Sequence, residues 1–243
     1  MLMDIVLRHR VLMLSPASVV TPVCALTLAV TAILMPTRLH GQGLAGQLTM
    51  LEKDGVRTTD LANSVVWLEP QTAAGPVPRQ TARIAMEGKQ FVPRVQVVAV
   101  GSAVEYPNHD PFRHNVFSKS GPAEFDLGLY ARGDTRQMQL DRAGIYPVFC
   151  NIHAKMVAYV LAVSSPYTVR PGADGRFVFD NVPSGTYTLK VWHERGGQSS
   201  RPITVPNDAA SSLALQLDAR SYRLAQHKNK FGGNYTTSGS ERY

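Results

Sequence analysis

The sequence predicts an all-β protein that consists of two sandwiches and is preceded by an apolar N-terminal helix. Short apolar runs alternate with residues that favour turns through the middle and the C-terminal part of the chain, a pattern typical of many short strands. Residues 44–218 show no convincing period of 3.6 residues, so amphipathic helices are not expected there. The chain of 243 residues is long enough for one or two domains.

The N-terminal part has the pattern of an export segment. Arg8 and Arg10 precede an apolar run without charges, residues 11–37, and a basic start followed by such a run is typical of a secretory signal. Gly43 offers a small residue for cleavage, whereas the length of the run also suits an uncleaved anchor. We therefore expect residues 1–43 to be a signal peptide or a membrane anchor, and the remainder to be exported.

The net charge of +7 is concentrated at the two ends of the chain. Residues 1–38 contribute +2 and residues 219–243 contribute +4, which leaves +1 for residues 39–218. A nucleic-acid-binding domain would need a basic stripe on a folded face. We therefore expect no nucleic-acid partner, and a membrane contact only through an uncleaved anchor.

Strand patterns continue through the middle of the chain. Residues 94–100 and 137–140 alternate between two faces, and residues 145–150 follow a turn as a further strand. Residues 157–163 are apolar on both faces, which is typical of a central strand with both sides covered. The pattern indicates a Greek-key sandwich.

The loop between the last two of these strands carries three soft or borderline metal ligands. Cys150, His153 and Met156 are spaced three residues apart, and His114 lies upstream. Two histidines, one cysteine and a weakly held methionine are the ligand set of a blue-copper site. The only other cysteine, Cys24, lies in the apolar N-terminal run, so Cys150 has no disulfide partner after export. A lone cysteine in an oxidising compartment is a free thiol or a ligand, and a bound metal would occupy its sulfur.

Other interpretations of these residues are weaker. Each residue alone is more often structural than functional, because cysteine and methionine are common core residues. Zinc could use the same set, but methionine is a poor zinc ligand. A nucleophilic pair of Cys150 and His153 is disfavoured, since the two lie close together on one loop and no orienting carboxylate is evident. His109 is interpreted as a loop residue or an alternative ligand, and His193 and His227 are expected on the surface.

Residues 79–165 resemble a cupredoxin of the plastocyanin and amicyanin type. The residues that carry the resemblance are Phe91-Val92-Pro93, Tyr106-Pro107-Asn108, His114-Asn115-Val116-Phe117, Gly144-Ile145-Tyr146 and the Cys150, His153 and Met156 loop. The resemblance implies one type 1 copper bound by His114, Cys150, His153 and Met156. It also implies one-electron transfer through His153, and a role for Asn115 in tying the two ligand loops together.

Residues 166–218 resemble a carboxypeptidase-regulatory or prealbumin-like β-sandwich. The motifs are Asp174-Gly175-Arg176-Phe177 and Val182-Pro183-Ser184-Gly185-Thr186-Tyr187-Thr188-Leu189. This stretch is short for a full copy, so residues 44–78 could supply its first strands, which would make the cupredoxin an insertion. Alternatively, residues 44–78 belong to the cupredoxin sheet, and contacts between Trp67 and residues 177–191 would decide. The basic, polar tail, residues 219–243, is expected to be solvated, or else to dock through Phe231 and Tyr235.

The combined architecture resembles bacterial proteins of the methylamine-utilisation type. The resemblance implies a periplasmic or cell-envelope copper protein that is not an enzyme. It would carry single electrons between partners such as a dehydrogenase and a c-type cytochrome. The alternative is an envelope binding module for carbohydrate or protein, with copper stored or vestigial. The oligomeric state does not follow from the sequence.

Overall fold

The computed structural model of the chain describes residues 42–72, 75, 77–206, 208, 212–224 and 226–235. In this part of the chain the regular elements are strands and one short 3-10 helix, so the all-β prediction is confirmed. The expected N-terminal helix and Cys24 lie outside the described residues. Gln42 and Gly43, which were expected to end the export segment, already belong to the first strand. No helix of the described part has the length and apolar character needed to cross a membrane.

The elements follow one another along the chain as follows. They are β1 (Gln42–Leu51), η1 (Leu61–Asn63), β2 (Val65–Pro70), β3 (Thr81–Arg83), β4 (Ala85–Glu87), β5 (Gln90–Val92), β6 (Val95–Ala99), β7 (Ser102–Pro107), β8 (His114–Ser118), β9 (Phe125–Tyr130), β10 (Thr135–Leu140), β11 (Gly144–Cys150), β12 (Val157–Val163), β13 (Thr168–Val169), β14 (Arg176–Val182), β15 (Gly185–His193), β16 (Gly197–Val205) and β17 (Leu213–Asp218).

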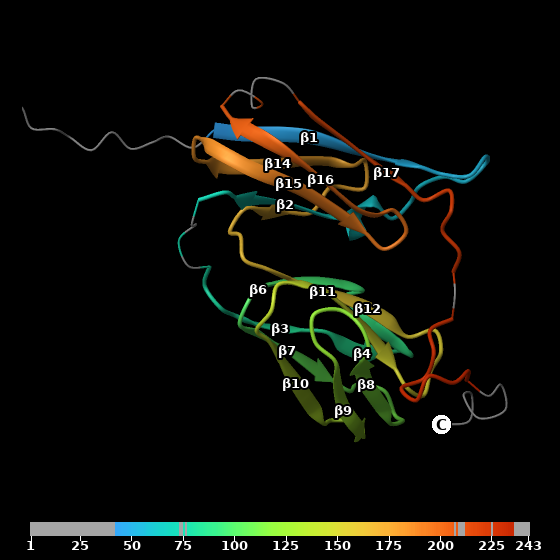
Figure 1. The fold of residues 1–243 in the computed structure, drawn as a ribbon. Coiled ribbons are helices and arrows are strands. Elements are labelled where there is room, and N and C mark those ends of the chain that lie inside the picture. Colours follow the sequence, from blue (N-terminus) through green and yellow to red (C-terminus); the bar gives the residue numbers. More distant parts are fainter. Residues whose placement is uncertain are drawn as a thin grey trace, which may run out of the picture. The chain divides into compact units, whose positions relative to one another are not determined.

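Strands β3–β12 form a first sandwich, which we call sandwich A (Figure 1). One sheet has the order β10-β7-β3, the other has the order β6-β12-β11-β8-β9, and β4 and β5 form a separate hairpin. Alternate residues of the strands point inward, as the period-2 pattern requires. They build one buried core that includes Tyr106, Val148 and Cys150. The end of β11 and the start of β8 therefore rest on a fixed, packed layer.

Strands β1, β2 and β13–β17 form a second sandwich, sandwich B, with its own core. Its sheets have the orders β14-β1-β17 and β13-β2-β15-β16. Strand β1 pairs with β14 and β17, and β2 pairs with β15, where Trp67 lies opposite Lys190. The described residues of 44–78 thus contribute strands to sandwich B and none to the sheets of sandwich A. All strands of sandwich A fall between β2 and β13 in the sequence.

Strand β12 explains why a run of residues in this chain is apolar on both faces. It lies between β6 and β11 in its sheet, and its Val160 packs into the core of sandwich A. Leu161, on the opposite face, packs into a third cluster together with Trp67 and Trp192 of sandwich B. Both faces of β12 are therefore covered by apolar side chains, which is why the sequence shows no alternation there.

Polar contacts accompany this third cluster. The guanidinium of Arg94, beside β6, makes two hydrogen bonds of 2.7 and 2.6 Å to the carboxylate of Glu194. Arg170 donates to the carbonyl oxygen of Val95 over 2.8 Å. A bidentate Arg–carboxylate pair fixes orientation as well as distance. The contact between the two sandwiches is therefore held by directed polar bonds as well as by apolar packing.

The prediction that His193 lies on the surface is wrong. The side chain is 1% exposed and its Nε2 atom lies 3.2 Å from the carbonyl oxygen of Asp60. Next to it, Arg195 pairs with both Asp60 and Glu52. His193 ends β15, and the chain before η1 folds over it. The side chain of His193 is therefore buried although the residue lies at the end of a strand.

Candidate metal centre

Cys150 is the last residue of β11, and its position is set by the sheet. Strand β11 pairs with β12 along its length, and Cys150 lies opposite Val116 of β8. The side chain is fully buried in the core of sandwich A. His114 begins β8, two residues before the partner of Cys150, so the pairing of β8 with β11 brings the imidazole and the thiol to the same end of the sandwich.

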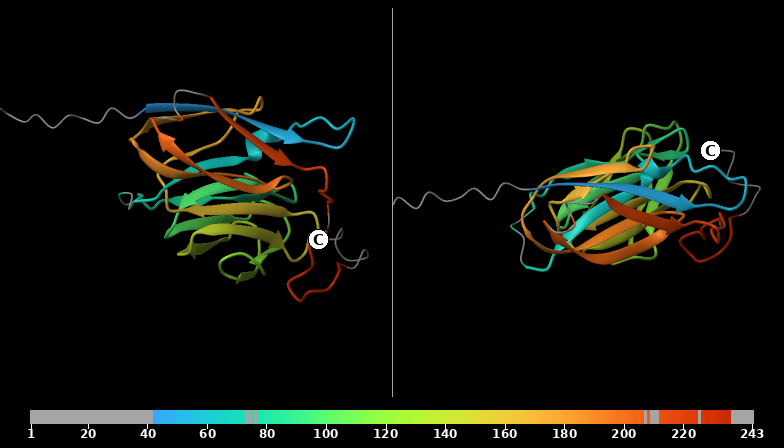
Figure 2. Two further views of the ribbon diagram at one scale, coloured as in Figure 1. Left: turned by 45° about the horizontal axis from the view of Figure 1, so that its top comes forward. Right: turned by 90° about the horizontal axis from the view of Figure 1, so that it is seen from above.

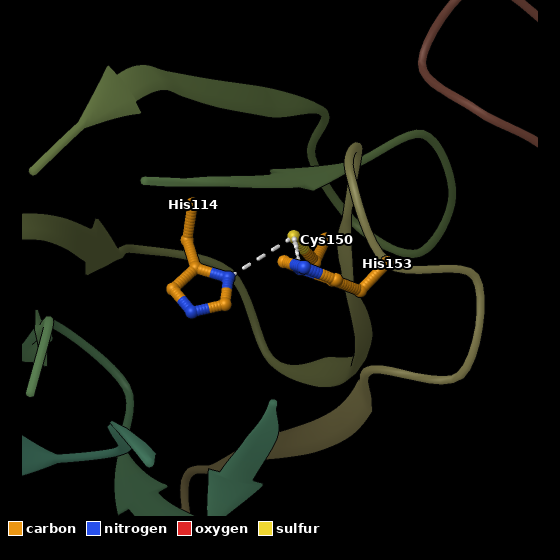
Figure 3. Close-up of side chains that lie close together, drawn as sticks. All are labelled: His114, Cys150 and His153. Atoms are coloured by element: carbon orange, nitrogen blue, oxygen red, sulfur yellow. Dashed lines mark hydrogen bonds between the residues drawn. The ribbon is translucent and has the colours of Figure 1, made fainter. Parts of the chain in front are cut away.

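The loop that joins β11 to β12 folds back on Cys150. The N–H of Met156 donates to the carbonyl oxygen of His153 over 3.0 Å, and the N–H of Cys150 donates to the carbonyl oxygen of Met156 over 3.3 Å. The N–H of Ile152 points at the sulfur, 3.4 Å away. These contacts close a tight turn that brings the side chain of His153 back to the thiol (Figure 3).

Three of the four predicted ligands offer their donor atoms to one point. The Nδ1 atoms of His114 and His153 lie 3.5 and 3.6 Å from the sulfur of Cys150. The ligand atoms of the three residues all lie within 4.8 Å of one another. Figure 3 shows both rings with a nitrogen turned toward the sulfur, and their centroids lie 4.8 Å apart. Two nitrogens and one sulfur at this spacing can hold a soft or borderline metal ion.

Met156, the fourth predicted ligand, belongs to the same buried cluster as Cys150. Its side chain is 1% exposed. The turn described above ties its backbone to both His153 and Cys150. The structure thus places Met156 beside Cys150 and His153, on the loop that the spacing of the sequence predicted, and its role as a ligand stays a prediction.

His114 is oriented by a carboxylate that the sequence analysis missed. Its Nε2 atom lies 2.9 Å from Oδ2 of Asp110, and Asp110 is only 5% exposed. A carboxylate can only accept, so Nε2 carries the hydrogen and Nδ1 keeps its lone pair toward the sulfur. Burial alone would raise the pKa of Asp110, but hydrogen bonds from the N–H of Lys89, from His114 and from the N–H of Gly88 outweigh it and lower the pKa.

His153 is buried and has a free nitrogen. The residue is 5% exposed, and its Nε2 atom has no hydrogen-bond partner among the described residues. Burial lowers the pKa of His153 to about 4, with further lowering from the charges of His114 and Lys89. The ring of Phe112 lies 5.4 Å from that of His153 and 5.2 Å from that of His114. The imidazole is therefore neutral at physiological pH, which is the form that binds metals.

The donor set fits a copper ion. Burial raises the pKa of the Cys150 thiol, so the group is protonated and apolar without a metal, and a metal ion would displace its proton. The neutral imidazoles present unprotonated nitrogens, and the Asp110–His114 pair has the form of a carboxylate–histidine–metal arrangement. His109 is exposed and is not part of this cluster. Among the described residues no carboxylate oxygen belongs to the cluster itself, so its donor atoms are two nitrogens and one sulfur.

Asn115 does join the two ligand-bearing segments, but through its backbone. Its carbonyl oxygen accepts from the N–H of Asn151 over 2.9 Å. Its side chain instead donates to Oδ1 of Asp126 over 2.6 Å and to the carbonyl oxygen of Gly128 over 3.0 Å. The side chain therefore fixes β9 against β8 rather than reaching the cysteine loop.

One expectation for the tail is wrong, and of the two alternatives for its arrangement the described residues support docking through Tyr235. His227, expected on the surface, is half-buried and stacks on Phe149 with ring centroids 4.4 Å apart. The tail was expected to be solvated or else to dock, and the hydroxyl of Tyr235 donates to the carbonyl oxygen of Cys150 over 2.7 Å. Phe231, one of the two residues suggested for docking, is 83% exposed. The aromatic ring of Phe149 offers an apolar surface that the tail covers, and no sequence pattern near residue 227 signalled this.

Comparison with known proteins identifies relatives of one part of the chain. No protein-family model matches it. The plastocyanins of Ulva arasakii and Ulva pertusa are 37% identical to it over 73 residues, which is 26% of this chain and 74% of each plastocyanin. A purple cupredoxin from Nitrosopumilus maritimus is 21% identical with a TM-score of 0.31, over 34% of this chain and 99% of that one. Amicyanin from Paracoccus versutus is 21% identical with a TM-score of 0.33, over 40% of this chain and 97% of that one.

The plastocyanin match is long and similar enough to assign the family. It covers most of each algal protein, and it agrees with a sandwich whose β8 and β11 bring His114 and Cys150 together. The predicted relationship to cupredoxins is confirmed, whereas the prealbumin-like character of sandwich B stays a prediction. Through this part of its sequence, the chain belongs to the plastocyanin family of cupredoxins.

Proposed function

We propose that the chain is a blue-copper protein that carries single electrons between redox partners. The copper ligands would be His114, Cys150, His153 and Met156, in one type 1 site. The observation that carries the proposal is the convergence of two imidazole Nδ1 atoms on one buried thiol. A copper ion bound there supplies the redox chemistry, because it holds one electron as Cu(I) and gives it up as Cu(II).

The surrounding residues fix the positions of the candidate ligands and shield them from water. Cys150 and His114 sit on paired strands, and Asp110 holds the ring of His114 from the side away from the sulfur. Burial of Cys150 and His153 keeps water from the sulfur. A site whose ligands are fixed by the protein needs little rearrangement when its charge changes by one, so electron transfer has a low barrier.

We infer that electrons pass through the edge of His153. A pocket of about 560 Å³ lies beside this residue, and its lining includes Lys89, Arg94 and Lys155. Arg94 is neutralised by Glu194, but no carboxylate of the described residues pairs with either lysine. The positive charge of the two lysines on this face supports a partner with acidic groups around its own redox centre. The donor loses one electron to this protein, and the acceptor gains one from it.

The partners and location follow the same proposal. A dehydrogenase as donor and a c-type cytochrome as acceptor, in the periplasm or cell envelope, suit the export pattern of residues 1–43 and the cupredoxin relationship. Sandwich B would be a prealbumin-like host into which the copper domain is inserted, as in proteins of the methylamine-utilisation type. The pairing of β2 with β15 supports that arrangement.

One experiment tests the function. The purified protein is mixed with Cu(II), and its visible spectrum and redox titration are recorded. We expect an intense thiolate-to-copper band and one reversible electron per chain, both absent in Cys150→Ala. The alternative, an envelope binding module that stores copper, would give bound copper without a reversible couple. A wild-type protein that stays colourless and binds no copper would exclude both.

A further inference from the structure

A segment near the C-terminus, residues 226–235, lies against the strand ends that carry the candidate ligands; we call it the strap. It follows β17 in the sequence, and Figures 1 and 2 show it in red beside sandwich A. Its Tyr235 reaches Cys150 at the end of β11. Its His227 ring stacks on Phe149 with an interplanar angle of 26° and contacts Phe117 edge-on at 6.3 Å. Phe149 directly precedes Cys150 in β11, so the strap covers the residue next to the thiol.

The strap also bonds to Cys150 itself. The hydroxyl of Tyr235 donates its single hydrogen to the carbonyl oxygen of Cys150 over 2.7 Å. The same oxygen of Tyr235 accepts from Nδ1 of His227, 3.2 Å away. The stacked ring and the hydroxyl thus support each other, and together they hold the backbone of the predicted thiolate ligand.

A second pair of contacts closes a ring of polar groups. The N–H of Lys230 donates to Oδ1 of Asn151 over 2.8 Å, and its ammonium group pairs with Oδ2 of Asp126 over 2.7 Å. Asp126 accepts from the side chain of Asn115, whose carbonyl oxygen accepts from the N–H of Asn151. Asn115 follows His114 in the sequence, and Asn151 follows Cys150. Lys230 therefore links the segments of both ligands.

We propose that the strap is a built-in clamp for the metal centre, in which Tyr235 and Lys230 act as positioning residues. The proposal deepens the proposed function, since the ligands it positions are those of the copper site. By holding the backbone of Cys150 and the side chain of Asn151, the strap limits local opening at the end of β11, where the thiol would otherwise become accessible. Residues that contact the ligands of a metal, but not the metal itself, tune its affinity and reduction potential in this way.

The first test measures opening at Cys150 without any metal. Tyr235→Phe, Lys230→Gln and the double variant are made in a Cys24→Ser background, so that Cys150 is the only thiol of the chain. The rate at which the metal-free protein reacts with a thiol-specific disulfide reagent is measured. Each lost hydrogen bond should speed the reaction about fivefold, and the double variant should react faster still.

Matched controls lie just before the strap. Tyr222→Phe removes a hydroxyl that bonds to Glu194 at 3.2 Å, and Arg223→Gln removes one exposed positive charge. Both should react at the wild-type rate. Lys230→Arg keeps the charge that pairs with Asp126 and should restore a rate close to wild type. Thermal unfolding is followed in every variant, because faster reaction that merely tracks global unfolding would overturn the proposal.

The second test uses the copper-loaded protein. Loss of the Tyr235 hydroxyl leaves the carbonyl oxygen of Cys150 without this donor. The thiolate of Cys150 then becomes more electron-rich and stabilises Cu(II) relative to Cu(I). We expect Tyr235→Phe to shift the thiolate-to-copper band, lower the reduction potential and speed copper release to a chelator, with no change in Tyr222→Phe. Thiol reaction rates in the variants within twofold of the controls would overturn the proposal. If the wild type binds no copper, only the proposed function fails, and the thiol rates still decide whether the strap clamps Cys150.

Discussion

The carboxylate of Asp110 and the imidazole of His114 form a buried pair in which Oδ2 lies 2.9 Å from Nε2. The other bonds of Asp110 come from the backbone: Gly88 donates to Oδ1 over 2.7 Å and Lys89 donates to Oδ2 over 2.9 Å. The hairpin between β4 and β5 therefore holds Asp110, and Asp110 holds the ring of His114. This chain of contacts fixes which nitrogen of His114 faces the sulfur of Cys150.

We predict that Asp110→Asn weakens metal binding by about ten- to a hundredfold, the usual effect of losing such a partner. The amide would lose the negative charge and would place a donor against a backbone N–H or against Nε2 of His114. Competition with a chelator of known affinity measures the change. Asp141→Asn, at an exposed position after β10, is the control and should bind as the wild type does. Equal affinities of Asp110→Asn and the control would show that the pair does not orient the ligand.

The cluster between the two sandwiches gives a stability prediction. Leu161 is 1% exposed and packs with Trp67 and Trp192, so Leu161→Ala should lower the free energy of unfolding by about 2–5 kcal/mol. Both tryptophans of the chain lie in this cluster, so their fluorescence reports on it during denaturant unfolding. Leu129→Ala, at a side chain that is 48% exposed, should change little. A loss below about 0.5 kcal/mol, the range of surface substitutions, would contradict the packing described here.

The lysines beside His153 predict a charge-dependent reaction rate. Removing both positive charges, with Lys89→Gln and Lys155→Gln together, should slow oxidation by ferricyanide at least about threefold at low salt. Oxidation by a cationic cobalt complex should not slow. Stopped-flow absorbance of the copper-loaded protein measures both rates at low and high salt. Arg201→Gln, at an exposed position on β16, controls for net charge, and equal slowing in that variant would refute a role for this face.

His193 predicts how stability depends on pH. Burial lowers the pKa of His193, and the charge of Arg195 adds to this, while Asp60 and Glu194 oppose it. The unfolded chain takes up a proton near pH 6.5 that the folded chain resists, so the folded state loses stability as the pH falls below about 6.5. His193→Gln keeps a donor toward Asp60 but cannot be protonated. The wild type should therefore lose more unfolding free energy than this variant between about pH 7 and pH 5.5, and parallel curves would contradict the assignment.

Much of the fold and the candidate ligand set could be predicted from the sequence because both depend on local patterns. Cys150, His153 and Met156 lie at regular spacing on one loop, and the alternating pattern of the strands around that loop indicates a sandwich. The register of β8 against β11, which brings His114 to the thiol, is a long-range pairing that the sequence supports only through family resemblance.

The features that were missed depend on contacts between distant segments. Asp110 lies in a loop, where its spacing from His114 has no periodic meaning, and an acidic residue shortly before the histidine was its only signal. The docking of Tyr235, expected only as the alternative to a solvated tail, joins two residues that are 85 positions apart in the sequence. The burial of His193 depends on the chain around Asp60. The polar, basic composition of the tail predicted that it is solvated, because a contact between distant segments produces no pattern in the residues next to it.

The central claim is that two imidazoles and one thiolate of this chain hold a copper ion that exchanges one electron. Its most direct test is the visible spectrum of the protein during a redox titration after addition of Cu(II). The proposed site predicts an intense band that bleaches with one electron per chain, returns on oxidation and is absent in Cys150→Ala. A spectrum without that band, or a band that persists in Cys150→Ala, would contradict it.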